Sequence, residues 1–302
     1  MRWRLDSYRS IPVSVRGAHA EERGSSIRWS GCELMGVVNT TPDSFSDGGL
    51  YLSEAAAVAH ARQLAADGAF VVDVGGESTR PGADVVPLDV ELERTIPVIE
   101  RIAADGNVLV SVDTRKPQVA AAAIAAGAHL VNDVGGLRDP AMVAVCAEAG
   151  VPAVVMHMRG DPATMQDDPR YDDVVGEVVA WLIQQATMAT ASGLPSVMID
   201  PGIGFGKTVE HNVALFRALP LTDRYPVLIG ASRKRTIQQL GRLDPSADRD
   251  IGSVAAHLYA AHRGAAMVRV HDVAGHRQAF AVDRGLRGPA LRPESSAEPS
   301  ES

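Results

Sequence analysis

One regularity constrains the fold of this chain more than any other: short apolar runs alternate with alanine-rich, amphipathic stretches of helical length. The runs have the length of buried strands and occupy 33–38, 69–74, 107–112, 128–132, 152–157, 196–200, 226–231 and 265–271. The stretches of helical length include 53–66, 87–104, 116–126, 140–149, 171–192 and 209–219. Strands that alternate with helices form parallel βα units, and eight such units close a ring. The pattern therefore predicts an α/β fold, the (β/α)8 TIM barrel, as a single domain.

An internal repeat supports the barrel. Its four copies are ADGAFVVDV (66–74), AAGAHLVNDV (125–134), EAGVPAVVM (148–156) and HRGAAMVRV (262–270). In each copy a helix ends, a glycine follows and a strand begins, as expected for a left-handed helix cap. Asp73, Asn132 and Arg269 each lie five residues after their glycine. We expect these three at one level of the sheet, at the carboxyl ends of the strands, where barrel enzymes place their sites.

Composition limits the classes of function. The chain has 302 residues, of which 46% are hydrophobic and only 4% aromatic, so its core must be aliphatic, as in a buried parallel sheet. A net charge of −8 argues against a general nucleic-acid or membrane-surface binder. No apolar run approaches the roughly 20 residues that span a bilayer, and the N-terminus lacks a signal-peptide core. The expected location is the cytoplasm, and the two cysteines suggest neither a disulfide framework nor a metal site.

The barrel is expected to occupy residues 31–286, between two dissimilar ends. Residues 1–30 lack sustained periodicity and are predicted either to be disordered or to form a short β plug across the barrel floor. After residue 286 the apolar content collapses, and proline, serine and glutamate dominate. Such a composition cannot bury a core, so residues 287–302 are predicted to be a disordered tail.

The stretch MGVVNTTPDSFSDGG, residues 35–49, is the most distinctive in the chain. Its apolar half stops abruptly at Asn39, and proline, paired glycines and small hydroxyl residues follow. These residues are typical of a shaped loop, and a polar loop directly after a buried strand indicates a site. We expect the loop to act as a mobile lid.

All eight predicted strands end in polar or ionisable residues. These are Asn39; Asp73; Asp113; Asn132 and Asp133; His157; Asp200; Ser232, Arg233 and Lys234; and Arg269 and His271, followed by Asp272. Single residues of this kind often cap helices or pair locally, and we assign that role to Asp73, Asp133, His157 and Asp272. Polar groups at eight strand ends together indicate a binding site.

The chain has only three lysines, Lys116, Lys207 and Lys234, and each follows a predicted strand closely. Where arginine is so favoured, a lysine points to a need for a compact ammonium donor. We interpret Lys116 instead as a surface residue of a first helical turn. The Gly206-Lys207-Thr208 segment does not complete a phosphate-binding P-loop, because Pro201 stands where that motif requires glycine.

The chemistry of these strand ends suits two kinds of ligand group. Asp113, Asn132, Asp200 and Lys234 could fix a flat heterocycle that has amino and carbonyl edges. Charged hydrogen bonds of this type contribute roughly 1.5–3 kcal/mol each.

The second ligand group is a phosphate or diphosphate, which suits Arg269, His271 and Asn39. The Asn39 amide oxygen is a hard ligand for Mg²⁺ when substrate phosphates and water complete the octahedron. No nucleophilic serine or cysteine has a plausible histidine partner, so we expect positioning and charge stabilisation rather than covalent catalysis.

These segments together resemble one family. NTTPDSFSDGG, VDVGGESTRPGA, SVDT, NDVGG, MHMRGDPATMQ, DPGIGFGKTVEHN, GASRKR and RVHDV are similar, in order, to the motifs of the dihydropteroate synthases of bacterial folate synthesis. The likeness runs from about Glu33 to about Phe280. It implies a TIM barrel, usually a homodimer, that uses Mg²⁺ and is a sulfonamide target. The implied reaction joins (7,8-dihydropterin-6-yl)methyl diphosphate to 4-aminobenzoate, releasing diphosphate and forming 7,8-dihydropteroate by a dissociative mechanism.

The resemblance also implies roles for individual residues. The catalytic residues would be Asp113, Arg80 and Lys234. The pterin contacts would be Asp113, Asn132, Met156, Asp200, Phe205 and Lys234. The diphosphate contacts would be Asn39, Thr79, Arg269 and His271, with Asn39 as the Mg²⁺ ligand. The 4-aminobenzoate contacts would be Thr79, Arg80, Pro81, Phe205, Ser232 and Arg233.

Two other functions compete with this interpretation. A pterin-dependent methyltransferase has a related pocket, but it has no use for a diphosphate clamp or for the TPDSFSDGG loop. A catalytically silent paralogue, acting as a binding or regulatory barrel, would be expected to lose Asn39, Arg80, Arg269 or His271. All four are present.

Overall fold

A computed structural model describes residues 2–7, 26–40, 54–78, 84–161 and 164–288. Its main sheet is a parallel barrel whose strands run in the order β8-β7-β6-β5-β4-β3-β10-β9. The strands are β3 (Glu33–Asn39), β4 (Val71–Gly75), β5 (Leu109–Asp113), β6 (Leu130–Asp133), β7 (Ala153–Met156), β8 (Val197–Asp200), β9 (Leu228–Ile229) and β10 (Met267–Val270). A parallel bridge between Ile199 and Val227 joins the two edges and closes the ring. The predicted (β/α)8 barrel is confirmed.

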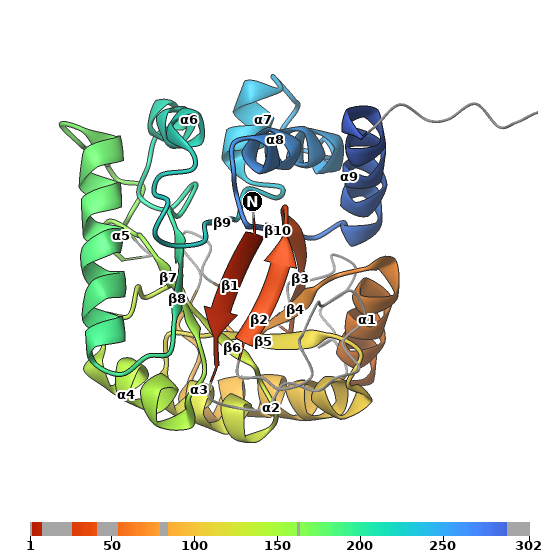
Figure 1. Cartoon of the computed structure of the whole chain (residues 1–302), viewed down its shortest axis with the longest axis vertical. Helices are drawn as coiled ribbons and strands as arrows, with labels where there is room; N and C mark the ends of the chain where they lie inside the picture. Colours follow the sequence, from red (N-terminus) through yellow and green to blue (C-terminus); the bar gives the residue numbers. More distant parts are fainter. Residues whose placement is uncertain (1, 8–25, 41–53, 79–83, 162–163, 289–302) are drawn as a thin grey trace, which may run out of the picture.

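The helices surround the strands as an outer ring (Figure 1). They are α1 (Glu54–Asp67), α2 (Leu88–Asp105), α3 (Pro117–Ala125), α4 (Pro140–Ala149), α5 (Val174–Ala191), α6 (Val209–Ala218), α7 (Arg235–Leu240), α8 (Asp250–His262) and α9 (Val273–Arg287). The first six match the predicted stretches to within three residues at each end. The stretches of helical length given from the sequence did not include α7, α8 and α9. Helix α7 has only six residues, and α8 exposes Ile251, which blurs its apolar face.

The glycines of the internal repeat adopt the predicted conformation. Gly68, Gly127, Gly150 and Gly264 have φ angles of 102°, 111°, 67° and 93°. Only glycine takes up these left-handed angles at little cost, so it allows each helix to stop and the chain to turn into the next strand. This turn chemistry sets the level at which each strand begins, and therefore the level of the polar residue five positions later.

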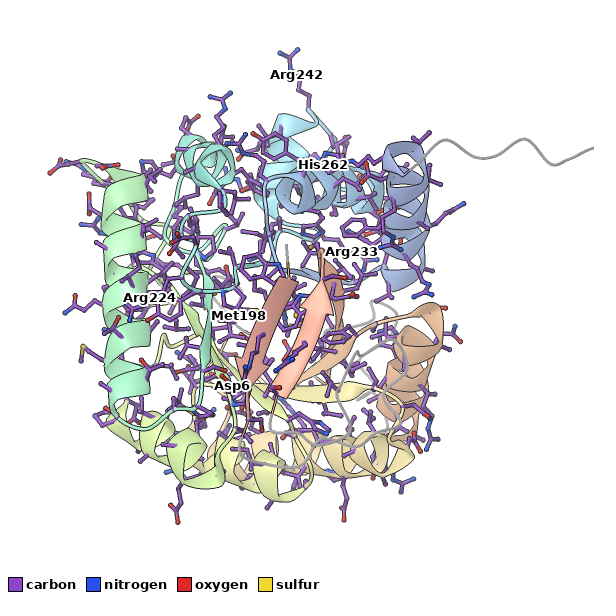
Figure 2. All side chains as sticks on the ribbon, in the orientation of Figure 1. Asp6, Met198, Arg224, Arg233, Arg242 and His262 are labelled. Carbon is purple, nitrogen blue, oxygen red and sulfur yellow. The ribbon has the colours of Figure 1, made fainter. Side chains whose placement is uncertain are left out.

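The described parts of the first 30 residues form an antiparallel pair, β1 (Arg2–Asp6) and β2 (Ser26–Ser30). The pair lies across the centre of the helix ring (Figure 1). Trp3, Leu5, Ile27 and Trp29 pack against apolar residues near the amino ends of the barrel strands, among them Met198, which Figure 2 shows beside β1. This packing fills the barrel from the end opposite the strands' carboxyl termini. Within the described ranges, no helix is long and apolar enough to cross a membrane.

We predict that Trp29→Ala destabilises the whole barrel. The Trp29 side chain is 3% exposed, and its indole Nε1 donates to the Ala266 carbonyl at 2.8 Å. Truncating a buried tryptophan leaves a cavity and typically costs about 3–5 kcal/mol. Urea unfolding of the intact chain measures the change in free energy.

Met188→Ala is the matched control, because the Met188 side chain is 54% exposed on the outer helix α5. It should change the unfolding free energy by less than about 0.5 kcal/mol. If Trp29→Ala costs no more than the control, the β1–β2 pair is not part of the folding core.

Candidate active site

The carboxyl ends of the strands open into one cleft of about 1270 Å³. Nearly all the predicted site residues line it. They are Asn39, Asp113, Asn132, Met156, Asp200, Phe205, Ser232, Arg233, Lys234, Arg269 and His271. The predicted residues Thr79, Arg80 and Pro81 lie outside the described residues, as does the proposed lid after Thr40. The cleft therefore collects side chains from strand ends around the barrel.

Arg269 connects two buried carboxylates at the base of the cleft. Its Nε donates to Asp73 Oδ2 and its Nη2 to Asp113 Oδ2, each at 2.7 Å. Asn132 Nδ2 donates to the same Asp73 oxygen at 2.9 Å. Asp73, Asn132 and Arg269 thus meet at one level, as the five-residue offset predicted. The assignment of Asp73 to local pairing was wrong, because its partners come from β6 and β10.

Burial controls the charge of Asp113. Removal from water raises the pKa of its carboxyl to about 7, Arg269 opposes the rise, and nearby Asp73 adds to it. A carboxyl with this pKa can be ionised near neutral pH while remaining sensitive to small changes around it. Strongly shifted groups that converge in a cleft are typical of active sites.

A second acid–base pair consists of Asp200 and Lys234. Burial raises the pKa of Asp200 and lowers that of Lys234 to about 8, while each charge partly offsets the effect on the other. A Cβ on Gly230 would lie 3.8 Å from Asp200 Oδ2 and 3.9 Å from Lys234 Nζ. The two charged groups therefore converge directly over this glycine. Lys234 Nζ also lies 4.3 Å from the centre of the Phe205 ring.

One wall of the cleft is apolar. Met156 belongs to a buried cluster with Val134, Met158 and Met165, and Phe205 packs against it. Sequence reasoning identified Met156 and Phe205 but missed the other three. The methionines of the MHMRGDPATMQ segment were the available signal. Such a wall beside hydrogen-bonding groups suits a flat ring.

Ser232 and His271 meet on the opposite side. The His271 backbone N–H donates to Ser232 Oγ at 3.2 Å, and His271 Nδ1 lies 2.9 Å from the same oxygen. Arg233 lines the cleft, but its guanidinium makes two bonds to Asp250, at 2.6 and 2.7 Å. Its charge is therefore already paired.

The remaining residues at the strand ends have mainly structural contacts. Asp272 caps α9 by accepting from Gly275 N at 2.9 Å, and Asp133 accepts from Gly135 N at 2.7 Å. These two local assignments are confirmed. Lys207 is buried, and its Nζ lies 3.0 Å from His157 Nδ1.

Lys207 also donates to backbone carbonyls, which agrees with excluding a P-loop. Its Nζ donates to the oxygens of Gly202 and Phe205 at 3.1 and 3.0 Å. Burial lowers the Lys207 pKa to about 7. The ammonium thus holds together the loop that follows β8.

The interpretation of Lys116 as a surface residue was wrong. The residue lies at the start of α3, but its ammonium pairs with Glu77 at 2.6 Å and with Glu91, which is fully buried. Thr114 Oγ1 donates to the same Glu91 at 2.6 Å. This network joins the loop after β4 to the loop after β5. It therefore anchors the segment that leads into Thr79.

Comparison with known proteins agrees with this geometry. The sequence pattern of the family described as "Pterin binding enzyme" matches residues 35–271. Dihydropteroate synthase of Escherichia coli K12 is 45% identical over 255 residues, covering 83% of this chain and 90% of that protein.

Two solved structures are also similar. The structure of Xanthomonas albilineans dihydropteroate synthase with 4-aminobenzoic acid is 48% identical, with a TM-score of 0.81, and the match covers 88% of this chain and 96% of that one. The structure of the same enzyme in complex with 7,8-dihydropteroate is 44% identical, with a TM-score of 0.78, covering 88% and 97%.

The chain belongs to the pterin-binding barrel enzymes. Among these it is a member of the dihydropteroate synthase family, as both the length of the match and the degree of identity show.

We predict that Asp113 makes stability depend on pH in a definite direction. Its pKa is raised from 3.8 to about 7, so the folded chain holds a proton that the unfolded chain has released between these values. The contribution to stability is fully present below about pH 4 and is lost as pH rises through about 7. The difference in unfolding free energy between the wild type and Asp113→Asn should fall across this range.

Urea unfolding at a series of pH values measures this difference. Substitution of the exposed Asp172 by Asn controls for the removal of one carboxylate. A wild-type-minus-variant difference that stays flat, or rises with pH, would contradict the buried environment of Asp113.

Proposed function

We propose that the cleft catalyses the dihydropteroate synthase reaction. This reaction converts (7,8-dihydropterin-6-yl)methyl diphosphate and 4-aminobenzoate into 7,8-dihydropteroate and diphosphate. The observation that carries the proposal is the convergence of two acid–cation pairs, Asp113–Arg269 and Asp200–Lys234, beside the apolar wall formed by Met156. This arrangement suits a ligand that combines a flat polar ring with a highly charged leaving group.

The pterin ring would lie against Met156 and Phe205. Its amino groups would donate to Asp200 and to the Asn132 amide oxygen, while Lys234 would supply a donor to ring acceptors. Asn132 Nδ2 already donates to Asp73, which fixes the orientation of the amide and would turn its oxygen towards the ring. Because the groups are held in place before binding, little ordering is needed when the ring enters.

The diphosphate would lie towards Arg269, His271, Asn39 and Thr79. The donor set fits a metal that arrives with the substrate better than a resident metal centre. The described part of the chain contains no cluster of three or more His, Cys, Asp or Glu side chains able to hold an ion. The Asn39 amide supplies one hard oxygen, and Mg²⁺ commonly takes the rest of its octahedron from phosphates and water. Bound there, Mg²⁺ would neutralise charge on the leaving diphosphate.

Catalysis would be dissociative, with cleavage of the carbon–oxygen bond before the arylamine attacks. Arg269 and His271 would stabilise negative charge on the departing diphosphate. Asp113 would stabilise the pterin methylene cation, which the amine nitrogen of 4-aminobenzoate then attacks, losing a proton to form the product. Preorganised charges in a partly buried cleft favour such a transition state because they need not reorient during the reaction.

The 4-aminobenzoate would enter on the side of Ser232. Its carboxylate would lie near the Ser232 hydroxyl and the start of α7, and its ring near Phe205. Arg233 would contribute its backbone or stem, because Asp250 engages its guanidinium. Thr79, Arg80 and Pro81 would complete this pocket, with Arg80 acting in catalysis.

The enzyme would work as a homodimer in the cytoplasm. Exposed apolar side chains on the neighbouring helices α7, α8 and α9 support an assembly surface there: Leu240, Ile251, Tyr259, Val282 and Leu286 are 42–87% exposed.

We predict that the purified chain forms dihydropteroate when supplied with both substrates and Mg²⁺. A sulfonamide should compete with 4-aminobenzoate, because it presents a similar arylamine to the Ser232 pocket. Product formation is followed by chromatography, and inhibition by varying both ligands.

Asp200→Asn, which weakens the pterin site, should be nearly inactive, whereas Arg242→Gln should keep wild-type turnover. Arg242 is exposed and points away from the molecule (Figure 2). A chain that binds the pterin diphosphate but forms no product would support the silent paralogue instead.

We predict that Asn39→Ala lowers turnover by about tenfold or more at limiting Mg²⁺, because a metal site that loses one partner commonly loses this much affinity or activity. Asn39→Asp keeps an oxygen ligand and should restore most of the loss. Steady-state rates across a Mg²⁺ titration measure both variants. Unchanged turnover of Asn39→Ala at limiting Mg²⁺ would remove Asn39 from the metal site.

A further inference from the structure

Two histidines face each other beneath the cleft. His257 on α8 and His276 on α9 are both completely buried, and His257 Nδ1 lies 2.8 Å from His276 Nε2. Neither residue lines the cleft. Buried polar side chains are costly unless every hydrogen-bonding group is satisfied, so this pair calls for an explanation.

The outer ends of the pair contact the backbone of two active-site loops. His257 Nε2 accepts from the Ala231 N–H at 3.2 Å, and His276 Nδ1 lies 2.5 Å from the Asp272 carbonyl oxygen. A backbone N–H can only donate and a carbonyl can only accept. His276 must therefore carry its proton on Nδ1 and accept at Nε2. His257 must then also carry its proton on Nδ1, which it donates to His276.

Together with the Ser232–His271 contact, these bonds form a closed ring of hydrogen bonds between the two loops. Ala231 precedes Ser232, and Asp272 follows His271. Ser232 Oγ accepts from the His271 backbone N–H at 3.2 Å and lies 2.9 Å from its Nδ1. The two loops are thus joined twice, once within the cleft and once beneath it through the histidine pair.

The loop that carries Ser232 needs such support. Arg233 has a φ of +60°, a left-handed conformation that is uncommon outside glycine and costs energy. Its backbone N–H donates to Ser253 Oγ at 2.9 Å, and that hydroxyl donates to the Arg249 carbonyl at 2.6 Å. Helix α8 therefore binds the backbone on both sides of Ser232. His257 accepts from the N–H of the preceding residue, Ala231, and Ser253 accepts from the N–H of the following residue, Arg233.

We propose that His257 and Ser253 are positioning residues for the arylamine substrate, and that His276 holds His257 in place by accepting its Nδ1–H. They hold the Ser232 hydroxyl where the carboxylate of 4-aminobenzoate would bind. The inference rests on the proposed placement of that substrate beside Ser232.

This ring of hydrogen bonds can form only when both histidines are neutral. One additional proton on either ring would place an N–H of His257 against the Ala231 N–H, so the bond to the loop would be lost. Burial lowers the pKa of both histidines, and electrostatic interaction with His276, Lys234 and His271 lowers that of His257 further. Asp272 and Asp250 face His276 and act in the opposite direction.

The test compares two substitutions at one position. His257→Met removes both hydrogen bonds, whereas the amide of His257→Gln can still accept from Ala231 and donate to His276. His257→Met should raise the KM for 4-aminobenzoate about tenfold, as expected for the loss of about one hydrogen bond. His257→Gln should stay within about threefold of the wild type. The KM for the pterin diphosphate should change little in either.

His262→Gln is the matched control, because His262 lies on the same helix and its side chain is 40% exposed (Figure 2). It should leave both KM values unchanged. Equal increases in both KM values for His257→Met, or no advantage of Gln over Met, would show that the histidine is merely structural and would overturn the proposal.

A second measurement does not depend on activity or on the folding of His257→Met. Nitrogen-15 NMR of histidine-labelled wild-type protein should show His257 and His276 as neutral Nδ1–H tautomers at pH 7. His276→Leu removes the acceptor of the His257 Nδ1–H and should raise the KM for 4-aminobenzoate about threefold, while the Ala231 N–H keeps His257 in the Nδ1–H tautomer. An Nε2–H or charged His257 in the wild type would overturn the proposal.

Ser232→Ala separates this inference from the proposed function. If the wild type forms product but Ser232→Ala leaves the KM for 4-aminobenzoate unchanged, the placement of the substrate is wrong and the positioning role falls with it. If Ser232→Ala raises that KM while His257→Met and Ser253→Ala do not, the placement stands and only the positioning role fails.

Discussion

The arrangement of charged side chains at the carboxyl end of the barrel depends on the guanidinium of Arg269. Two carboxylates, Asp73 and Asp113, are buried within hydrogen-bonding distance of it. Carboxylates this close in a medium of low dielectric constant cannot both ionise unless a cation lies between them. Arg269 supplies that cation, and its planar fork reaches both acids at once. In the proposed function, the remaining N–H groups of the same guanidinium would bind the diphosphate of the substrate.

Positioning catalysis requires that such groups be held by a second layer of contacts. Two networks provide it on different sides of the cleft. Lys116 with Glu77 and Glu91 ties the loops after β4 and β5 together. The pair His257 and His276 ties the loop after β9 to the loop after β10. Each network joins neighbours in the barrel that are distant in sequence, so each holds loops that their own strands could not hold alone.

Much of the fold and most of the cleft could be predicted from the sequence. A parallel barrel buries both faces of its strands, which therefore appear as apolar runs, and its helix ends appear as glycines. The errors share one cause. Lys116 looks like a surface residue because its partner Glu91 lies 25 positions away, and Asp73 looks local because Arg269 lies 196 positions away. No periodicity within either segment reports such a partner.

The sequence by itself determined the eight strands, the glycine caps between helix and strand, and the polar residue at the end of each strand. It did so because hydrophobic period, turn conformation and motif spacing are local properties of the chain. The lid that begins after Asn39 remains a sequence-based prediction. Only the tertiary structure decided which charges share Arg269, that the charge of Arg233 is paired with Asp250, and that two histidines brace Ser232 from below. These outcomes depend on closure of the ring, because closure sets the distances and the exclusion of water that give each charge its partner and each histidine its tautomer.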